Sequence, residues 1–486
     1  MNRELKRVSI VVLLMFIALF VSTSVIQVGV ADTLNADQRN SRTRLDGYNV
    51  QRGAILVAGQ PVAQSVPSTD DYKYQRVYTD GPLYAPITGF FPINGQATGI
   101  EGALDSQLSG TSNTTFLERL NNILTGKSPQ GNSVETTIDP IAQKAAYDAL
   151  GNLQGAVVLI QPKTGRILAL ASTPSFDPNT LASHDSKQVD ATYQTLLNAP
   201  GNPLVSKAYT DLNPPGSTFK LVVASAALST GKYTKDSQLP NPASLTLPGT
   251  STVVRNDSFT TCGPGATVSI ETALQLSCNI PMAELGIELK SPTIKKQAEA
   301  FGFNSAFTIP MKSSASGYPG YPGDSAQTGM SAFGQASDTA TALQMAMVSA
   351  GIANGGVVMD PNLIESVQTP SLTEVPGTGF TPKEFGRAIS PDVAATMTQL
   401  MVNNVANGVA GNARIDGVSV GGKTGTAQNE GTKPYTLWFT GFAPTDNPEF
   451  AVAVVVENGG GLGQSSNGNA IAAPIAKKVL EAVLSK

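Results

Sequence analysis

Ser217 and Lys220 stand three residues apart, where the helix breaker Pro214-Pro215-Gly216 ends and an apolar run begins. On a helix, positions i and i+3 share one face, so the lysine amine can lie beside the serine hydroxyl. If burial keeps that amine neutral, it can take the hydroxyl proton and make the serine a nucleophile. The free backbone N–H groups and positive dipole end of a first helical turn also stabilise an oxyanion. The pair therefore predicts a serine that attacks acyl groups.

The same spacing recurs at Ser229, so the pair alone does not identify a site. The two matches differ in context. Ser217 precedes the apolar stretch 219–228, whereas Ser229 follows it and Gly231 then indicates a helix stop. We interpret the second match as a structural helix end and assign the chemistry to the first.

Two further motifs follow in the order that such a nucleophile needs. They are the S-x-N string Ser277-Cys278-Asn279 and the K-T-G string Lys423-Thr424-Gly425-Thr426. Each also has a second match, which we interpret as a flexible glycine-rich loop at 465–467 and as a hairpin turn at 163–165. One motif is weak evidence in a chain of 486 residues, whereas the ordered triple in fitting contexts is specific.

The side chains of the two later motifs suit the same chemistry. Ser277 can relay a proton between the amine and a leaving group, and Asn279 offers a donor and an acceptor to a substrate amide. Lys423 is expected to remain charged and to hold a carboxylate. Two hydroxyls for the same carboxylate, and a position without Cβ that lets the strand approach the substrate, are supplied by Thr424, Thr426 and Gly425.

The motifs S-x-x-K, S-x-N and K-T-G are the signature of the penicillin-binding proteins, the serine acyltransferases of bacterial cell-wall synthesis, and the chain resembles that family. The resemblance runs from about residue 135 to the end and includes strings at 137–140, 162–169, 174–179, 333–335, 353–356 and 438–444. It implies a mixed α/β transpeptidase fold, penicillin-binding/β-lactamase-like, with an antiparallel sheet between helices and a helical lobe. It also implies an oxyanion hole made by the backbone N–H groups of Ser217 and Thr426.

Apolar patterns support this fold class. Strands are predicted at 156–160, 167–171, 438–442 and 450–456, and helices at 219–228, 269–275, 341–352, 391–402 and 471–484. Stretches rich in proline, serine and glycine at 240–251 and 313–329 are predicted to be surface loops.

The segment 8–30 is almost wholly apolar and long enough to span a bilayer, with basic residues before it and Asp32 after it. We expect a cytoplasmic tail at 1–7, a retained single-pass anchor at 8–30, and the catalytic domain outside the cytoplasm. A cleavable signal peptide is the alternative, because 29–31 resembles a cleavage site. The apolar run, however, exceeds the core of about 7–15 residues that such peptides carry.

Residues 31–134 are polar and rich in turns, and they resemble the shortened N-terminal pedestal of class B penicillin-binding proteins. The transpeptidase domain is expected at 135–486, and the string 126–132 is interpreted as a linker. Class A relatives carry a glycan-polymerising domain in this position, for which roughly 100 residues are too few.

Cys262 and Cys278 are the only cysteines. Outside the cytoplasm a disulfide can form, and a bridge between them would clamp the segment that carries Ser277 and Asn279. The alternative is a pair of buried free thiols. A catalytic cysteine is disfavoured, because neither cysteine has a histidine nearby in sequence.

Other functional classes lack the residues they need. His184 is the only histidine, so a Ser-His-Asp triad or a histidine-rich metal site would depend on one residue. Two cysteines cannot build a four-cysteine zinc site, and we expect no metal and no cofactor. The net charge of -4 and the calculated pI near 5.3 provide no basic face, so no nucleic acid is expected as a partner.

By resemblance, the expected function is that of a membrane-anchored class B D,D-transpeptidase. Ser217 would attack the D-Ala-D-Ala amide of a peptidoglycan stem peptide, release D-Ala and pass the acyl group to an amine on a neighbouring strand. A β-lactam antibiotic would acylate the same serine. Family analogy also suggests a multi-spanning glycan polymerase and division proteins as partners.

Three alternatives remain open. A D,D-carboxypeptidase or a serine β-lactamase uses the same motifs with water as the acceptor, although no Glu-x-x-Leu-Asn element that could position a deacylating water follows Ser277. A β-lactam sensor would need further membrane segments, and no apolar stretch of spanning length recurs after residue 30. A non-catalytic penicillin-binding scaffold is the third.

Overall fold

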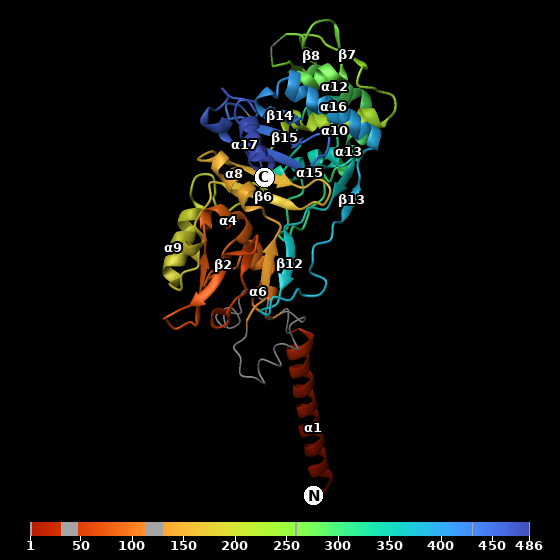
Figure 1. The fold of residues 1–486 in the computed structure, drawn as a ribbon. Coiled ribbons are helices and arrows are strands. Elements are labelled where there is room, and N and C mark those ends of the chain that lie inside the picture. The colour runs from red at the N-terminus through yellow and green to blue at the C-terminus, as the bar shows by residue number, and fades with distance from the viewer. Residues whose placement is uncertain (1, 31–46, 112–129, 258–259, 430, 486) are drawn as a thin grey trace.

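The computed structural model describes residues 2–30, 47–111, 130–257, 260–429 and 431–485. Most of the predicted linker at 126–132, and Asp32, lie outside these ranges. The described chain contains two five-stranded sheets, the first built largely from the N-terminal region and the second, called here the main sheet, built from strands within 155–173 and 421–456. A helical lobe lies beside the main sheet, at the end of the molecule opposite the first sheet (Figure 1).

The main sheet is antiparallel and runs in the order β14-β15-β16-β5-β6. Its strands are β5 (Gly155–Ile160), β6 (Ile167–Thr173), β14 (Gly421–Ala427), β15 (Thr436–Ala443) and β16 (Phe450–Val456). Successive side chains point to opposite faces, so Val157 and Val158 join two different hydrophobic clusters. Both faces are buried, which explains why these strands are continuous apolar runs in the sequence.

Helices cover both faces of the main sheet. α8 (Pro140–Leu150) and the C-terminal α17 (Ala472–Leu484) pack together on one face, and α15 (Ala342–Ala353) packs on the other, where α16 (Pro391–Asn407) contacts β14. This is the antiparallel sheet between helices that the family resemblance implied, and the predicted fold class is confirmed.

The helical lobe carries the segments that face β14. Its helices are α10 (Lys220–Ser229), α11 (Ile270–Gln275), α12 (Ile280–Leu289), α13 (Ser291–Ala300) and α14 (Ser325–Ser331). Three short strand pairs accompany them: β7 (Gln238–Pro240) with β10 (Thr267–Ser269), β8 (Leu245–Thr246) with β9 (Val253–Val254), and β11 (Val357–Met359) with β13 (Glu384–Arg387).

The first sheet has the order β12-β4-β1-β2-β3. Its strands are β1 (Ile55–Val57), β2 (Gln60–Pro67), β3 (Tyr74–Tyr78), β4 (Ser133–Thr136) and β12 (Ile364–Gln368). The helices around it are α4 (Gly81–Thr88), α5 (Gly99–Ala103), α6 (Asp105–Leu108) and α9 (Ser186–Leu197). β12 comes from far along the chain and pairs antiparallel with β4, so the two regions share one sheet.

A buried ion network stabilises this N-terminal region. Glu101 is fully buried and accepts from Arg52 Nε and Arg76 Nε, each at 2.6 Å, while the hydroxyl of Tyr78 lies 3.2 Å from the same carboxylate. Arg52 Nη1 also pairs with Asp105 Oδ1 at 2.6 Å, so two carboxylates face the two buried guanidinium groups. The two arginine charges lower the pKa of Glu101 although burial opposes them.

The N-terminal helix α1 (Asn2–Ser24) continues into a π-helical turn at Val25–Gly29. The helical segment Arg3–Gly29 has 27 residues and a mean hydropathy of 2.7, with none of its apolar window buried against the protein. At about 1.5 Å per residue it is longer than the hydrocarbon core of a bilayer, roughly 30 Å. It is therefore compatible with a single membrane span.

The predicted strands and helices of the transpeptidase region are confirmed to within a few residues, and one predicted loop is wrong. The stretch 313–329 was expected at the surface, but Tyr318 within it is fully buried and stacks on Phe219 with ring centroids 5.5 Å apart. Its glycine, proline and serine content correctly indicates irregular backbone over most of the stretch, but residues 325–329 begin helix α14. Composition does not reveal that one aromatic side chain anchors the segment under the nucleophile's helix.

Candidate active site

Ser217 lies in a single 3-10 turn, Gly216–Phe219, that leads directly into α10 at Lys220. Gly216 has a φ of 53°, and a Cβ there would lie 3.0 Å from the backbone nitrogen of Ala427 on β14. Glycine therefore permits both the left-handed backbone and the close approach to the strand. The turn places Ser217 beside the end of the K-T-G strand.

The same turn is held on its other sides. The backbone nitrogen of Gly216 donates to Gly334 O at 3.0 Å, and a Cβ on Gly334 would lie only 1.9 Å from Gly216 O. Trp438 on β15 is fully buried and donates from its indole nitrogen to Pro214 O at 2.9 Å. The position of the nucleophile is thus set by the segment after α14 and by the main sheet.

Lys220 is fully buried, and its Nζ has three polar neighbours. It donates to Ser277 O at 2.6 Å and to Asn279 Oδ1 at 2.8 Å, while Ser277 Oγ lies 3.4 Å away. Burial, and secondly the charge of Lys423, lower the pKa of Lys220 well below its usual range. The neutral amine that the sequence hypothesis requires is therefore favoured by the surroundings.

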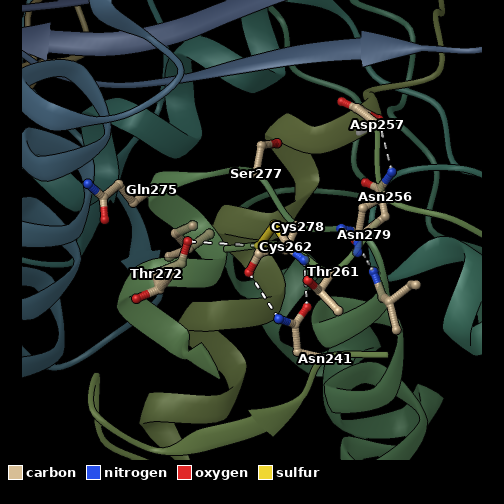
Figure 2. The surroundings of a disulfide bond; sticks show 12 residues. Asn241, Asn256, Asp257, Thr261, Cys262, Thr272, Gln275, Ser277, Cys278 and Asn279 are labelled. Carbon is tan, nitrogen blue, oxygen red and sulfur yellow. Dashed lines mark hydrogen bonds between the residues drawn. A yellow bond between two sulfur atoms is a disulfide. The ribbon is translucent and has the colours of Figure 1, made fainter. Parts of the chain in front are cut away.

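Ser277 has a left-handed backbone with a φ of 58°, which is strained for a residue with a side chain. Its neighbour Cys278 donates from the backbone to Ala273 O at 2.8 Å and is joined to Cys262 by a disulfide, with Cα atoms 5.7 Å apart. Figure 2 shows the disulfide beside Ser277, with Asn241 hydrogen-bonded to the backbone of Cys262. The predicted bridge is confirmed, and the alternative of two free thiols is wrong.

Both ends of the Asn279 carboxamide already have protein partners. Its Oδ1 accepts from Lys220, and its Nδ2 donates to Arg255 O and to Asp257 Oδ1, each at 3.2 Å. Because Nδ2 has two hydrogens and both are engaged, a donor for the substrate becomes available only if one partner is displaced. The second lone pair of Oδ1 remains available as an acceptor.

Lys423 is buried on β14, and its Nζ donates to Ser277 Oγ at 2.8 Å and to Thr424 O at 3.0 Å. Burial lowers its pKa to about 7, although the negative charge of Asp257 opposes this effect. Burial therefore makes the ammonium form of Lys423 less favourable than in an exposed lysine, and that Lys423 remains charged and holds a carboxylate stays a prediction. This burial is non-local, and no short motif encodes it.

The strand β14 presents its other motif residues to the cleft. Thr424, Gly425 and Thr426 all line it. A Cβ on Gly425 would lie 3.1 Å from Pro215 O and from the Thr218 side chain, so this glycine makes room for the nucleophile's own turn. The sequence hypothesis had reserved that space for the substrate.

The predicted oxyanion hole pairs two backbone segments that lie together. β14 is an edge strand of the main sheet, so alternate N–H groups along it have no strand partner and face the open side. A Cβ on Gly216 would lie 3.1 Å from the carbonyl carbon of Thr426. Ser217 and Thr426 are therefore on adjacent backbones, and their roles as oxyanion donors stay a prediction.

A cleft of about 560 Å³ opens over these groups. Several of its lining residues were missed by sequence reasoning, namely Asn256, Asp257, Thr260, Val409, Asn467, Gly468 and Asn469. The string at 465–467, interpreted from sequence as a flexible loop only, belongs to the segment that borders the cleft: Gly468 N donates to Thr426 Oγ1 at 3.2 Å. Apart from Asn467 in the second S-x-N match, no motif marks these positions, because they reach the cleft only through the fold.

The remaining sequence matches lie elsewhere, as expected. Ser229 is the last residue of α10, and 163–165 form the turn between β5 and β6. His184 pairs with Asp70 in the N-terminal region, with Nδ1 2.6 Å from Asp70 Oδ2. Among the described residues, no cluster of three histidine, cysteine or acidic side chains could hold a metal ion.

Two family models match the chain. The penicillin-binding protein transpeptidase domain matches residues 155–481, and the penicillin-binding protein A dimerisation domain matches residues 52–134. Among curated relatives, the peptidoglycan D,D-transpeptidase PbpA of Mycolicibacterium smegmatis is 41% identical over 100% of this chain and 99% of its own. The Escherichia coli K12 peptidoglycan D,D-transpeptidase MrdA is 28% identical over 92% of this chain and 74% of its own.

Solved structures show the same similarity. Penicillin-binding protein A from M. tuberculosis, as a ceftriaxone acyl-enzyme complex, superposes with a TM-score of 0.86 at 39% identity, covering 90% of this chain and 100% of that one. Its penicillin G acyl-enzyme complex superposes with a TM-score of 0.84, also at 39% identity, covering 89% of this chain and 99% of the other.

Proposed function

The chain belongs to the penicillin-binding protein transpeptidase family, and from this premise we propose how its own residues perform the reaction. It is a serine-type peptidoglycan D,D-transpeptidase, which cross-links stem peptides by acyl transfer and is acylated by β-lactams. The residue roles below rest on the geometry of the cleft.

Lys220 is the general base for acylation. A neutral amine has two N–H groups, which Ser277 O and Asn279 Oδ1 occupy, and one lone pair, which is left to accept a proton. Ser217 gives up its hydroxyl proton to that lone pair as Oγ attacks the carbonyl carbon of the D-Ala-D-Ala amide. The backbone N–H groups of Ser217 and Thr426 stabilise the resulting oxyanion.

Ser277 returns the proton to the leaving group. Its Oγ lies between the two amines, 2.8 Å from Lys423 Nζ and 3.4 Å from Lys220 Nζ, so it can accept a proton from one neighbour while donating its own. The C–N bond of the substrate then breaks, and D-Ala leaves with a neutral amine. The strained backbone and the disulfide hold this relay in place before the substrate arrives.

The carboxylate of the terminal D-Ala binds at β14. Lys423, which is buried under the cleft, supplies positive charge, and Thr424 and Thr426, which line the cleft, supply hydroxyls. Thr426 Oγ1 already accepts from Gly468 N, so its own hydrogen is free to be donated to the carboxylate. A bound carboxylate would in turn favour the ammonium form of Lys423.

We further propose that α1 is a retained membrane anchor and that residues 1–7 stay in the cytoplasm, with the catalytic domain outside. The apolar length of the helix and the basic residues at its start support this orientation. A multi-spanning glycan polymerase and division proteins are the partners that family analogy suggests.

The observation that carries the residue assignment is that Ser217 and Ser277 line one cleft and that Ser277 Oγ contacts both buried lysines. The full chain in detergent, treated with a fluorescent penicillin, should gain one penicillin mass, and peptide mapping should place it on Ser217. A Ser217→Ala variant should gain none. An adduct on any other serine would overturn the assignment.

A further inference from the structure

Asp257 carries the only carboxylate side chain among the described residues that line the cleft. It is exposed, follows the short strand β9, and no sequence motif includes it. Lys220 and Lys423 are buried beneath the cleft. On the exposed wall of the cleft, which a substrate contacts, Asp257 is therefore the charged side chain. A negative charge in this position attracts a cation.

The Asp257 side chain is held in a fixed orientation. Its Oδ1 accepts from Asn279 Nδ2 at 3.2 Å, and Figure 2 shows this hydrogen bond on the side of Asn279 that faces away from the disulfide. Its Oδ2 has no hydrogen-bond partner in the described ranges. One oxygen is thus anchored to the S-x-N motif, and the other is free to accept a hydrogen bond from a ligand.

A role in the first half-reaction does not explain this carboxylate. Its negative charge raises the pKa of both Lys220 and Lys423, which opposes the neutral amine that acylation requires. The donor peptide brings a carboxylate, which Asp257 repels. The second half-reaction differs, because the acyl acceptor is an amine that arrives at neutral pH as an ammonium.

We propose that Asp257 binds the ammonium group of the acyl acceptor and guides it to the acyl-enzyme. This inference rests on the proposed function, since it needs an acyl group on Ser217. The bound ammonium first gives one proton to the neutral Lys220, and its nitrogen lone pair then forms the C–N bond. The bond between the acyl carbon and Ser217 Oγ breaks, and Oγ takes the second proton from nitrogen. Asp257 orients the incoming group and takes no proton itself.

The test is a competition between two acceptors on one acyl-enzyme. The full chain in detergent is acylated by a benzoyl-D-alanyl thioester, whose acyl part carries no ammonium. D-alaninamide, largely an ammonium at neutral pH, competes with hydroxylamine, which is uncharged. The ratio of amide to hydroxamate product, measured by mass spectrometry, reports the preference for a cation. Because both nucleophiles react with the same acyl-enzyme, differences in the amount of acyl-enzyme between variants cancel in the ratio.

Asp257→Asn should lower the amide-to-hydroxamate ratio about fivefold, the upper size of one exposed ion pair. Asp236→Asn is the matched control, since it removes the same charge from an exposed side chain of the same lobe that lies outside the lining of the cleft, and it should leave the ratio unchanged. An unchanged ratio in Asp257→Asn, or an equal fall in both variants, would overturn the proposal.

The proposed function is tested separately in the same samples. Labelling of Ser217 by a fluorescent penicillin should persist in Asp257→Asn at a rate no lower than in the parent chain. If the variant loses this labelling, Asp257 serves acylation and the acceptor role is wrong. If the parent chain itself is not labelled, it is the assignment of Ser217 that fails.

Discussion

Replacing Lys423 by methionine should move the pH dependence of Ser217 acylation to higher pH. The two lysine nitrogens both contact Ser277 Oγ, at 3.4 and 2.8 Å, and therefore lie within about 6 Å of each other. Two unit charges at that separation repel by roughly 3 kcal/mol at an effective dielectric constant of about 20. This repulsion is one of the causes that lower the pKa of Lys220, so its loss makes the amine easier to protonate.

The magnitude follows from the same estimate. A repulsion of roughly 3 kcal/mol corresponds to about a hundredfold change in the acid dissociation constant of Lys220. The acylation rate rises with pH as Lys220 loses its proton, and this rising limb of the pH profile should therefore move to higher pH by as much as about two pH units. Because burial lowers the pKa of Lys423 to about 7, its ammonium form predominates below that pH, where the effect is largest.

The assay is the second-order rate constant for labelling by a fluorescent penicillin across a series of buffers of constant ionic strength. Loss of Lys423 also removes a contact to the antibiotic carboxylate, which lowers the height of the profile, so only its position along the pH axis is diagnostic. Lys423→Arg keeps the positive charge and should not move the rising limb of the pH profile to higher pH. Lys295→Met, which removes an exposed lysine of the lobe, should leave the profile in place. A limb in Lys423→Met that coincides with the parent, or moves to lower pH, would refute electrostatic tuning of Lys220.

Three further outcomes follow from contacts described above. Replacing Cys262 and Cys278 together by serine should lower the free energy of unfolding by about 3 kcal/mol, as expected for cysteines 16 residues apart, and urea unfolding monitored by proteolysis measures this loss. The same double variant should also be labelled more slowly by penicillin, because the Ser277 backbone relaxes. Gly334→Ala should slow labelling by roughly tenfold to a hundredfold, since its Cβ would lie 1.9 Å from Gly216 O, whereas Gly377→Ala, also at positive φ but with open space around it, should label normally. Glu101→Gln should cost about 3–5 kcal/mol of stability, because buried Arg76 loses its carboxylate and buried Arg52 keeps only Asp105, and equal thermal stability of the variant and parent would contradict the network.

Local sequence was sufficient for the parts of the site that a motif encodes. Ser217, Lys220 and Ser277 were identified because acyl transfer needs those side chains in that order, and the strands of the main sheet were identified because burial of both faces requires apolar runs. The disulfide was predicted because the chain has only two cysteines.

The missed features depend on distant parts of the chain. Asp257 and Gly468 border the cleft from loops that carry no motif, and Tyr318 is buried in a stretch whose composition indicates exposure. The pKa of Lys423 is set by burial from several elements at once, so its strand sequence could not reveal it. Such effects arise from tertiary packing and become visible only in three dimensions.

The pairing of β12 with β4 in the first sheet constrains the order in which the molecule can fold. β4 gains its antiparallel neighbour only when residues 364–368 arrive, more than 200 positions later in the chain. Until that point in synthesis, one edge of the nascent N-terminal sheet exposes unpaired backbone to other chains. Its completion must therefore wait for much of the catalytic region, so the protein acquires its final form as one late, cooperative assembly and not by the addition of independently finished modules.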